Sequence, residues 1–319
     1  MSIFKAVAAV LAWLGRQGTR AIAAIVFIGI AVPPLGALLK PFVTEAIFAL
    51  LTIAFLRVDL PALRGHIERP ALVLAATAWT MLAIPLLIGF GGLVFGLDSR
   101  SPDLMLALML NAVASPMMAA PAFAAVLGLD ATLVLVTLVA SSVLTPFTAP
   151  AFAYAFVGPA LTLSPLALGL KLAAILAGSV LVAALVRRIV GAAAIERHKQ
   201  EIDGFNIIIV FIFVAAVMEN IAAHFLAAPL IMLALVALAF ALSFAVVGVT
   251  MALFARAGRE RAFALALMAS QRNMGLMLAA TGGVLPDLVW VFFGLCQFPI
   301  YLSPQLVKPL VQRLKLAKT

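Results

Sequence analysis

Long apolar runs dominate this chain, and polar positions fall mainly between them. Several runs contain no charged residue, among them Ala21–Leu39, Ala71–Leu97, Leu104–Leu129 and Leu288–Val307. Ala131–Leu170 is also uncharged, but it is about twice as long as the roughly 20 apolar residues that cross a bilayer as a helix. Gly158-Pro159 and Pro165 should divide it into two helices, because glycine and proline interrupt helical segments.

The pattern therefore predicts an all-α membrane protein with ten transmembrane helices. The remaining spans are expected at Phe42–Phe55, Leu166–Val186, Phe205–Phe225, Leu230–Ala255 and Ala262–Val284. In this interpretation residues 1–20 form a cytoplasmic interfacial segment, and residues 311–319 form a cytoplasmic tail. The first apolar run is short and is followed by Arg16 and Arg20, which favours an amphipathic helix over a cleaved secretory signal.

Composition supports membrane integration. The chain of 319 residues is 66% apolar and 10% charged, whereas soluble domains are about 45–50% apolar and roughly 25% charged. Ten spans leave no room for a separate soluble domain. The sequence pI of about 10.5 would indicate a nucleic-acid partner in a soluble protein, but membrane topology accounts for the basic residues.

Basic residues orient the predicted spans. With the N-terminus inside, the inner segments hold 17 of the 21 lysines and arginines: Lys5, Arg16, Arg20, Arg57, Arg64, Arg69, Arg187, Arg188, Arg197, Lys199, Arg256, Arg259, Arg261, Lys308, Arg313, Lys315 and Lys318. Lysine and arginine accumulate in short cytoplasmic loops. Both termini are therefore predicted to be cytoplasmic, in a cell (bacterial inner) membrane.

The two halves of the chain, 21–157 and 160–310, resemble each other. The fourth and ninth spans both begin with Leu-Ala-Leu-Met, at Leu106–Met109 and Leu265–Met268, and carry a helix-breaking dipeptide further on, Ser115-Pro116 and Met274-Gly275. The halves also share an acid and a pair of prolines in the same order: Asp130 with Pro146 and Pro150, and Asp287 with Pro299 and Pro304. Five spans per repeat makes the second repeat inverted. Inverted repeats with interrupted helices at equivalent positions are typical of secondary transporters.

Arg272 is the residue most suggestive of function. A lone cation this deep in a span costs about 2.5 to more than 10 kcal/mol, so it should face the protein interior with a partner or an anion. The guanidinium offers a permanent, forked charge for carboxylate or phosphate; the alternative is a structural bond to free backbone carbonyls at the break. The candidate substrate-binding residues are Asn111, Ser115, Pro116, Gln271, Arg272, Asn273 and Gly275.

Coupling residues give a weaker signal. Thr80, Thr137 and Glu219 are candidates for ion coupling, with Glu219 either a proton-coupling carboxylate or a partner of Lys171. The three histidines lack metal-ligand spacing, and the chain contains no GxSxG or phosphate-binding loop and only one cysteine. No enzyme activity, metal or cofactor is expected. The expected partners are a small organic anion and the lipid bilayer, and the oligomeric state is left open.

Several segments carry a resemblance to a known family. They are IAFLRVDLPALR from Ile53, NAVASPMMAAPAFAAVLG from Asn111, SSVLTPFTAP from Ser141 and SQRNMGLMLAA from Ser270. In these the chain resembles the bile acid:sodium symporter superfamily. The resemblance implies ten spans in a panel and a core domain, with spans 4 and 9 unwound and crossing beside the substrate cavity. Transport would follow rocking of the panel against the core.

The sodium-site positions of that family are largely replaced here. The matching residues are Thr80, Ala119, Ala120, Leu133, Thr137, Met268 and Arg272. Sodium needs hard oxygen ligands, which alanine, leucine and methionine side chains lack. Arg272 would also repel a sodium ion 4 Å away by ~4 kcal/mol at an effective dielectric of 20.

The resulting hypothesis is that Arg272 replaces a bound sodium ion, so that Na⁺ is a doubtful coupling ion. The predicted function is secondary-active transport of a small organic anion by alternating access, without a requirement for sodium. The alternatives are an arsenite- or auxin-efflux-type carrier of the same wider fold, or a membrane sensor that does not transport.

Overall fold

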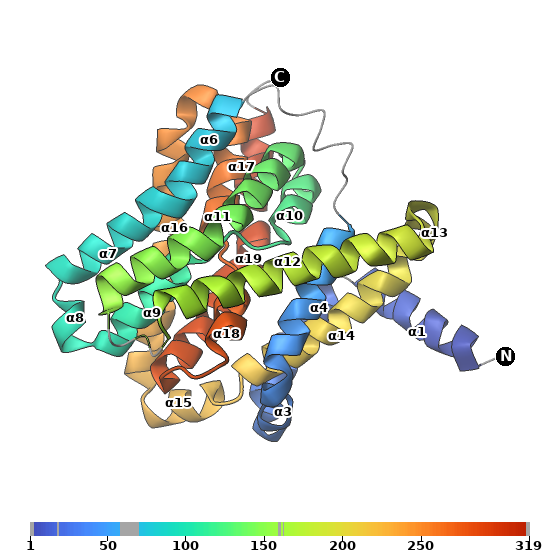
Figure 1. The fold of residues 1–319 in the computed structure, drawn as a ribbon, viewed down its shortest axis with the longest axis horizontal. Coiled ribbons are helices and arrows are strands. Elements are labelled where there is room, and N and C mark those ends of the chain that lie inside the picture. The colour runs from blue at the N-terminus through green and yellow to red at the C-terminus, as the bar shows by residue number, and fades with distance from the viewer. Residues whose placement is uncertain (1–2, 18, 58–69, 159–160, 162, 317–319) are drawn as a thin grey trace. The chain divides into compact units, whose positions relative to one another are not determined.

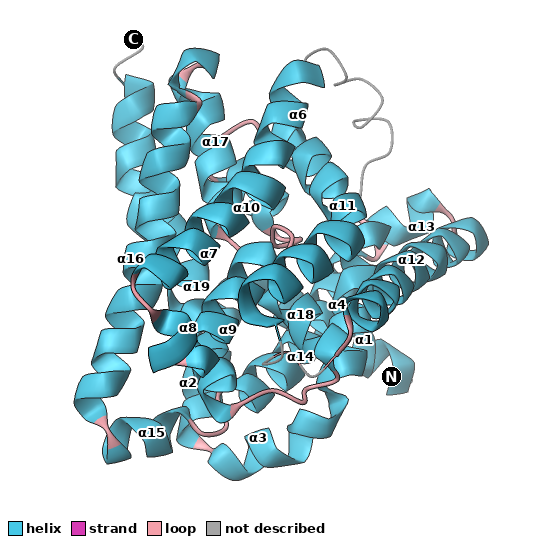
Figure 2. Ribbon diagram, turned by 60° about the vertical axis from the view of Figure 1, so that its left-hand side comes forward, coloured by secondary structure: helices cyan, strands magenta, loops and turns pink. Residues whose placement is uncertain are grey.

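The computed structural model describes residues 3–17, 19–57, 70–158, 161 and 163–316 (Figure 1). Over these residues the chain is almost entirely helical, as Figure 2 shows, and the only β-type pairing is an isolated bridge. The predicted all-α class is confirmed. The loop that holds Arg64 and Arg69, together with Pro159 and Lys318, lies outside the described residues.

Within the described residues, seven helical stretches are long and apolar enough to cross a membrane: Pro33–Leu56, Pro70–Val94, Ala131–Val157, Pro165–Val190, Lys199–Ala227, Pro229–Leu253 and Asp287–Pro309. A bilayer requires about 20 apolar residues per helix. The chain is therefore a multi-pass membrane protein. The predicted division of Ala131–Leu170 is also observed: α11 (Ala131–Val157) ends at Gly158, whose φ is +55°, and α12 (Pro165–Val190) begins at Pro165.

The predicted border between the first two spans is wrong. It was placed near Lys40, but α2 (Thr19–Ala31) ends before Val32, and one apolar stretch then runs from α3 (Pro33–Leu39) through a 3₁₀ turn into α4 (Val43–Leu56). Two prolines open α3. A residue before proline is forced out of the helical region, and Val32 has φ −126° and ψ 69°. The two prolines thus determine where α2 ends, whereas the length of the apolar run does not.

The chain forms two compact units, each of which draws segments from both halves of the sequence. Unit 1 comprises Met1–Val58, Ala173–Pro229 and Leu278–Gly283; unit 2 comprises Asp59–Leu172, Leu230–Met277 and Val284–Thr319. These units do not follow the boundaries of the proposed sequence repeats.

Unit 1 is organised around α14 (Lys199–Val217), which packs against α1 (Ile3–Gln17), α2, α3 and α4. Gly15 and Gly204 allow α1 and α14 to approach closely, since a Cβ at Gly204 would lie 1.9 Å from the Leu11 carbonyl oxygen. The short helices α13 (Ala192–Arg197) and α15 (Ile221–Ala227) flank α14 in the sequence. Between α14 and α15, Glu219 accepts from Lys40 Nζ at 2.8 Å. Lys40, rather than Lys171, is therefore the observed partner of Glu219.

Unit 2 contains the helices that build the candidate site. Its described helices include α6 (Pro70–Ala78), α7 (Ile84–Val94), α8 (Leu97–Arg100), α9 (Pro102–Val113), α10 (Ala120–Val126), α11, α16 (Pro229–Leu253), α17 (Arg259–Ser270) and α19 (Asp287–Leu316). A buried apolar cluster joins α10, α11 and α17 through residues such as Ala124, Leu138 and Phe263. α17 is buried along nearly its whole length, so its C-terminal end is held at a fixed place within the unit.

Candidate functional site

Two interrupted helices meet at the candidate site in unit 2. α9 ends at Val113 and α10 begins at Ala120, while α17 ends at Ser270 and α18 (Met274–Thr281) begins at Met274. The two interruptions pair with each other: Met117 N donates to Gln271 O, and Asn273 N donates to Ser115 O, both at 2.8 Å. This is the isolated antiparallel bridge between Pro116 and Arg272.

The first break lies where Ser115-Pro116 predicted it, but the second does not lie at Met274-Gly275. Both of those residues belong to α18, and Gly275 is a buried helical residue. The extended residues are Gln271–Asn273, where Gln271 has φ −98° and ψ 101°. Pairing with the other interruption holds these residues extended, and Asn273 Oδ1 then accepts from Leu276 N at 3.2 Å at the start of α18. Glycine is permissive at a break but does not force one.

Arg272 lies within this junction and is 5% exposed. Its Nη1 donates to two backbone carbonyls, Ala114 O at 3.0 Å and Thr80 O at 3.2 Å. No acidic side chain forms an ion pair with Arg272 among the described residues. The guanidinium is therefore held by carbonyl dipoles, and no carboxylate of the described residues neutralises its positive charge.

Local sequence explains why both carbonyls are free to accept. Ala114 is extended (φ −63°, ψ 143°) after the last turn of α9, so its carbonyl has left the helical pattern. Thr80 lies in a π-helical turn, Trp79–Ala83, in which Ile84 N donates to Trp79 O, five residues back. In the same register Thr80 O would accept from residue 85, which is a proline and has no N–H. π-turns within α-helices are frequent at functional sites.

Several other buried polar atoms near these elements lack a hydrogen-bond partner among the described residues. Arg272 Nη2 is one, and both amide atoms of Gln271 are others. The rest are the hydroxyls of Thr77, Thr80, Ser115 and Ser141. Buried polar groups are normally paired, and each unpaired one costs roughly 1–3 kcal/mol. Four of these atoms, on Ser115, Gln271 and Arg272, lie at the two helix breaks, and such a group is typical of a site that binds a polar ligand.

A cavity of about 40 Å³ in unit 2 borders Arg272. Its wall is formed by residues of α7, α9, α16, α17 and α19 and is mainly aliphatic. The polar members are Asn111, Ser243, Ser270, Arg272 and Cys296. Asn111 Nδ2 lies 3.7 Å from Cys296 Sγ. The cavity therefore combines one charged residue with a small number of neutral polar groups.

The predicted substrate-binding residues thus come together in part. Asn111 and Arg272 line the cavity, while Ser115, Pro116, Gln271 and Asn273 form the paired breaks. Gly275 belongs to α18. Sequence reasoning missed Ser243 and Cys296 as cavity residues; the signal for Ser243 was a lone serine within the most apolar span, α16.

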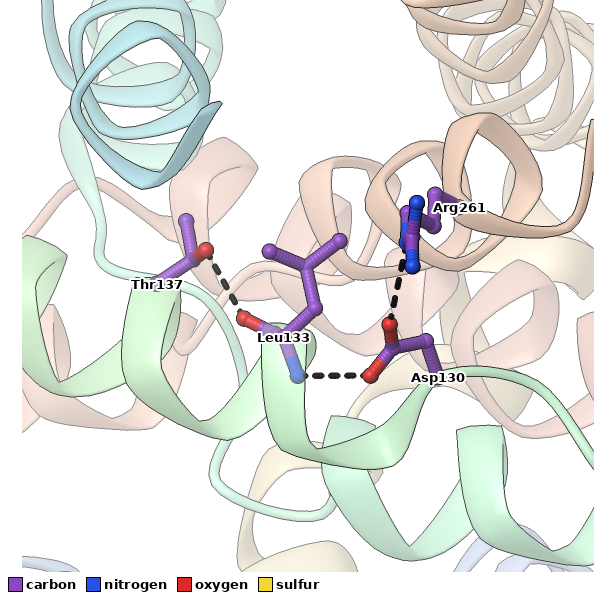
Figure 3. A network of polar contacts seen from close by, with 4 residues as sticks. All are labelled: Asp130, Leu133, Thr137 and Arg261. Atoms are coloured by element: carbon purple, nitrogen blue, oxygen red, sulfur yellow. Dashed lines mark hydrogen bonds and ion pairs between the residues drawn. The ribbon is translucent and has the colours of Figure 1, made fainter. Parts of the chain in front are cut away.

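The three coupling candidates have different surroundings. Thr80 contributes its carbonyl to Arg272, and its hydroxyl is unpaired. Thr137 lies on α11 in the network of Figure 3, where its hydroxyl donates to Leu133 O at 2.8 Å. In the same network Asp130 accepts from Leu133 N at 3.0 Å and from Arg261 Nε at 3.4 Å. Glu219 belongs to unit 1 and pairs with Lys40.

No group of three or more His, Cys, Asp or Glu side chains capable of holding a metal ion occurs within the described part of the chain. Comparison of the chain with models of known protein families and with curated proteins gives no match.

Proposed function

We propose that this chain is a secondary-active transporter of a small organic anion that works by alternating access and does not require sodium. The observation that carries the proposal is Arg272: a buried guanidinium at the junction of two broken helices, with Nη1 bonded to two free carbonyls and Nη2 unpaired. A buried cation without an acidic partner favours an anionic ligand.

The fold proposed for this activity has ten spans in two inverted five-helix repeats, with the broken helices as spans 4 and 9. In support, both breaks are paired at one place in unit 2, and both follow a helix of 12 residues that contains Leu-Ala-Leu-Met. Interrupted helices at corresponding positions are the typical location of transporter substrate sites.

The proposed role of Arg272 is to supply the positive charge that a coupling cation supplies in sodium-dependent carriers. Thr80 O and Ala114 O are hard oxygen ligands of the kind that a cation prefers, and Nη1 donates to both of them. A sodium ion at the same oxygens would be displaced sterically and repelled electrostatically. We propose that the chain carries this fixed charge within the lipid bilayer and without a protein partner.

Uptake of radiolabelled organic anions into proteoliposomes tests the proposal. We expect uptake that is unchanged when external sodium is replaced by N-methyl-D-glucamine and that is lost in Arg272→Gln. Arg272→Lys should retain only a small part of the activity, because lysine keeps the charge but not the fork. Strong stimulation by sodium would contradict the proposed coupling, and full uptake by Arg272→Gln would contradict the role of the arginine.

An arsenite- or auxin-efflux-type carrier and a membrane sensor remain the alternative functions. The same vesicles distinguish them from the main proposal. Arg272-dependent movement of arsenite or an auxin-type acid in place of other anions would favour the efflux class, and Arg272-dependent binding with no movement of any anion would favour a sensor.

A further inference from the structure

The cavity beside Arg272 restricts the kind of anion that this site can hold. Its volume of about 40 Å³ compares with about 10–15 Å³ needed for one water by the same kind of measure. The space suits a ligand of a few non-hydrogen atoms. A sterol-sized or other multi-ring anion would extend well beyond it.

The wall of the cavity is divided into a polar part and an aliphatic part. Among the described residues Arg272 is the only charged one that lines it, and Asn111 and Ser270 are its neutral polar neighbours from the two broken helices. Most other lining side chains are aliphatic, for example Ile84, Leu108 and Leu242. A ligand that matches both parts has one anionic end and a short apolar end.

Charge balance limits the ligand to a single negative charge. Arg272 supplies one positive charge to the cavity, and its Nη2, which carries two N–H donors, has no partner among the described residues. A second carboxylate in the same cavity would find no second cationic side chain among the described lining residues. Burying an unpaired charge is strongly unfavourable, so dicarboxylates are excluded by the same wall that accepts an alkyl group.

We infer that this cavity binds a short aliphatic monocarboxylate of about two to four carbons, with its carboxylate at Arg272 and its alkyl group among the aliphatic side chains of α7, α9 and α16. This inference rests on the proposed function, in that Arg272 is taken to be the anion-binding charge. It adds the substrate class and the location of the bound alkyl group.

The chain contains one cysteine, Cys296, which lines the cavity and serves as a built-in reporter. In the purified full chain, the small reagent methyl methanethiosulfonate can form a methyl disulfide, with release of methanesulfinate, only there. We expect sodium propionate to slow this modification at least fivefold relative to sodium chloride of equal ionic strength. Malonate, which has a second charge, and cyclohexanecarboxylate, which is too bulky, should protect less than twofold.

Two variants separate the site from general effects of carboxylate. Arg272→Gln removes the charge, and Ser243→Leu fills the cavity from α16 while leaving Arg272 in place; protection by propionate should be lost in both. Because a buried thiol reacts slowly, the melting temperature is measured for the same ligands. Propionate should raise it in the unmodified chain relative to chloride, as a ligand of the folded state does, and should not raise it in either variant.

Three results would overturn the inference: propionate neither protects Cys296 nor raises the melting temperature, malonate protects as well as propionate, or both variants retain protection. Uptake assays separate its failure from that of the proposed function. Arg272-dependent uptake of other anions without protection by propionate would overturn the cavity inference and leave transport standing. Protection by propionate without uptake of any anion would support the cavity and overturn transport.

Discussion

Arg272 shows how a membrane-buried cation is held when no carboxylate is near it. Each carbonyl bond to a charged donor contributes about 1.5–3 kcal/mol, and Nη1 makes two such bonds. Together they contribute about 3–6 kcal/mol, which is less than the upper estimates of the cost of burying the charge, more than about 10 kcal/mol. An anion bound at the unpaired Nη2 would offset the rest of this cost.

Gln271 provides a residue-level prediction because neither of its amide atoms has a partner and it is 1% exposed. Gln271→Met keeps a similar volume and removes the desolvation cost of the amide, which is about 1–3 kcal/mol. We expect the melting temperature of the purified chain without ligand to rise by about 1–3 °C, while anion uptake falls several-fold. A fall in melting temperature of several degrees would show that the amide is satisfied in the folded protein.

Much of the fold could be predicted from residue patterns, and the parts that could not depend on distant pairing. Charge-free runs identified helices such as α11 and α16, because lipid tolerates few polar groups in a span. Pro116 also identified the first break. The second break was predicted three residues late, because Gln271–Asn273 are held extended by bonds to residues more than 150 positions earlier in the sequence. No local pattern records such a partner.

The same reasoning separates the two parts of the candidate site. Arg272 was predictable, since a lone charge in an apolar span is rare. The π-turn that frees Thr80 O was not predicted, and Cys296 was noted only as an isolated cysteine. Cys296 faces the cavity because of how α19 packs in unit 2, which a single sequence does not reveal.

At the level of elements, Pro85 should affect the hydrogen bonding of Arg272 indirectly, because its missing N–H leaves Thr80 O free to accept from Arg272 Nη1. Pro85→Ala restores an N–H that can bond to Thr80 O in the π-turn and so competes with Arg272 Nη1. We expect anion uptake to fall several-fold while the melting temperature changes by no more than a few degrees. Pro102→Ala at the start of α9 is the matched control, because proline at a first helical position replaces no intrahelical bond. Equal uptake by the two variants would contradict this role of the π-turn.

Packing of α1 on α14 gives a second prediction at this scale. A Cβ at Gly204 would lie 1.9 Å from Leu11 O and 2.6 Å from Leu11 C, and backbone atoms cannot rotate away. Gly204→Ala should therefore cost about 1–3 kcal/mol through overpacking and speed trypsin cleavage at Arg16 on α1. Gly248→Ala on α16 is the control, since nothing lies within 4 Å of a Cβ there; it should be neutral or stabilising by up to about 1 kcal/mol. Equal cleavage of both variants would mean that α1 does not depend on this contact.

At the scale of the whole molecule, the number of crossings decides the topology. In the part of the chain that the structure describes, seven continuous helical stretches are long enough to span a bilayer. The other three predicted crossings are α2, which has 13 residues, and the two helices interrupted at 114–119 and 271–273. Thirteen residues of helix reach only about 20 Å, less than the roughly 30 Å hydrocarbon core, so α2 requires flanking residues to complete a crossing.

Ten crossings place the first and last residues of this chain on the same side, whereas seven would place them on opposite sides. Because lysine and arginine accumulate in the predicted inner segments, we expect both ends to be cytoplasmic. Green fluorescent protein fused at either end should fluoresce in bacterial cells, and alkaline phosphatase fused at the C-terminus should be inactive. In a Cys296→Ala background, an impermeant maleimide should label Ser99→Cys in whole cells, and Ala194→Cys only after the membrane is opened. Active phosphatase at the C-terminus together with a fluorescent N-terminal fusion would exclude every even number of crossings and, with it, two inverted five-helix repeats.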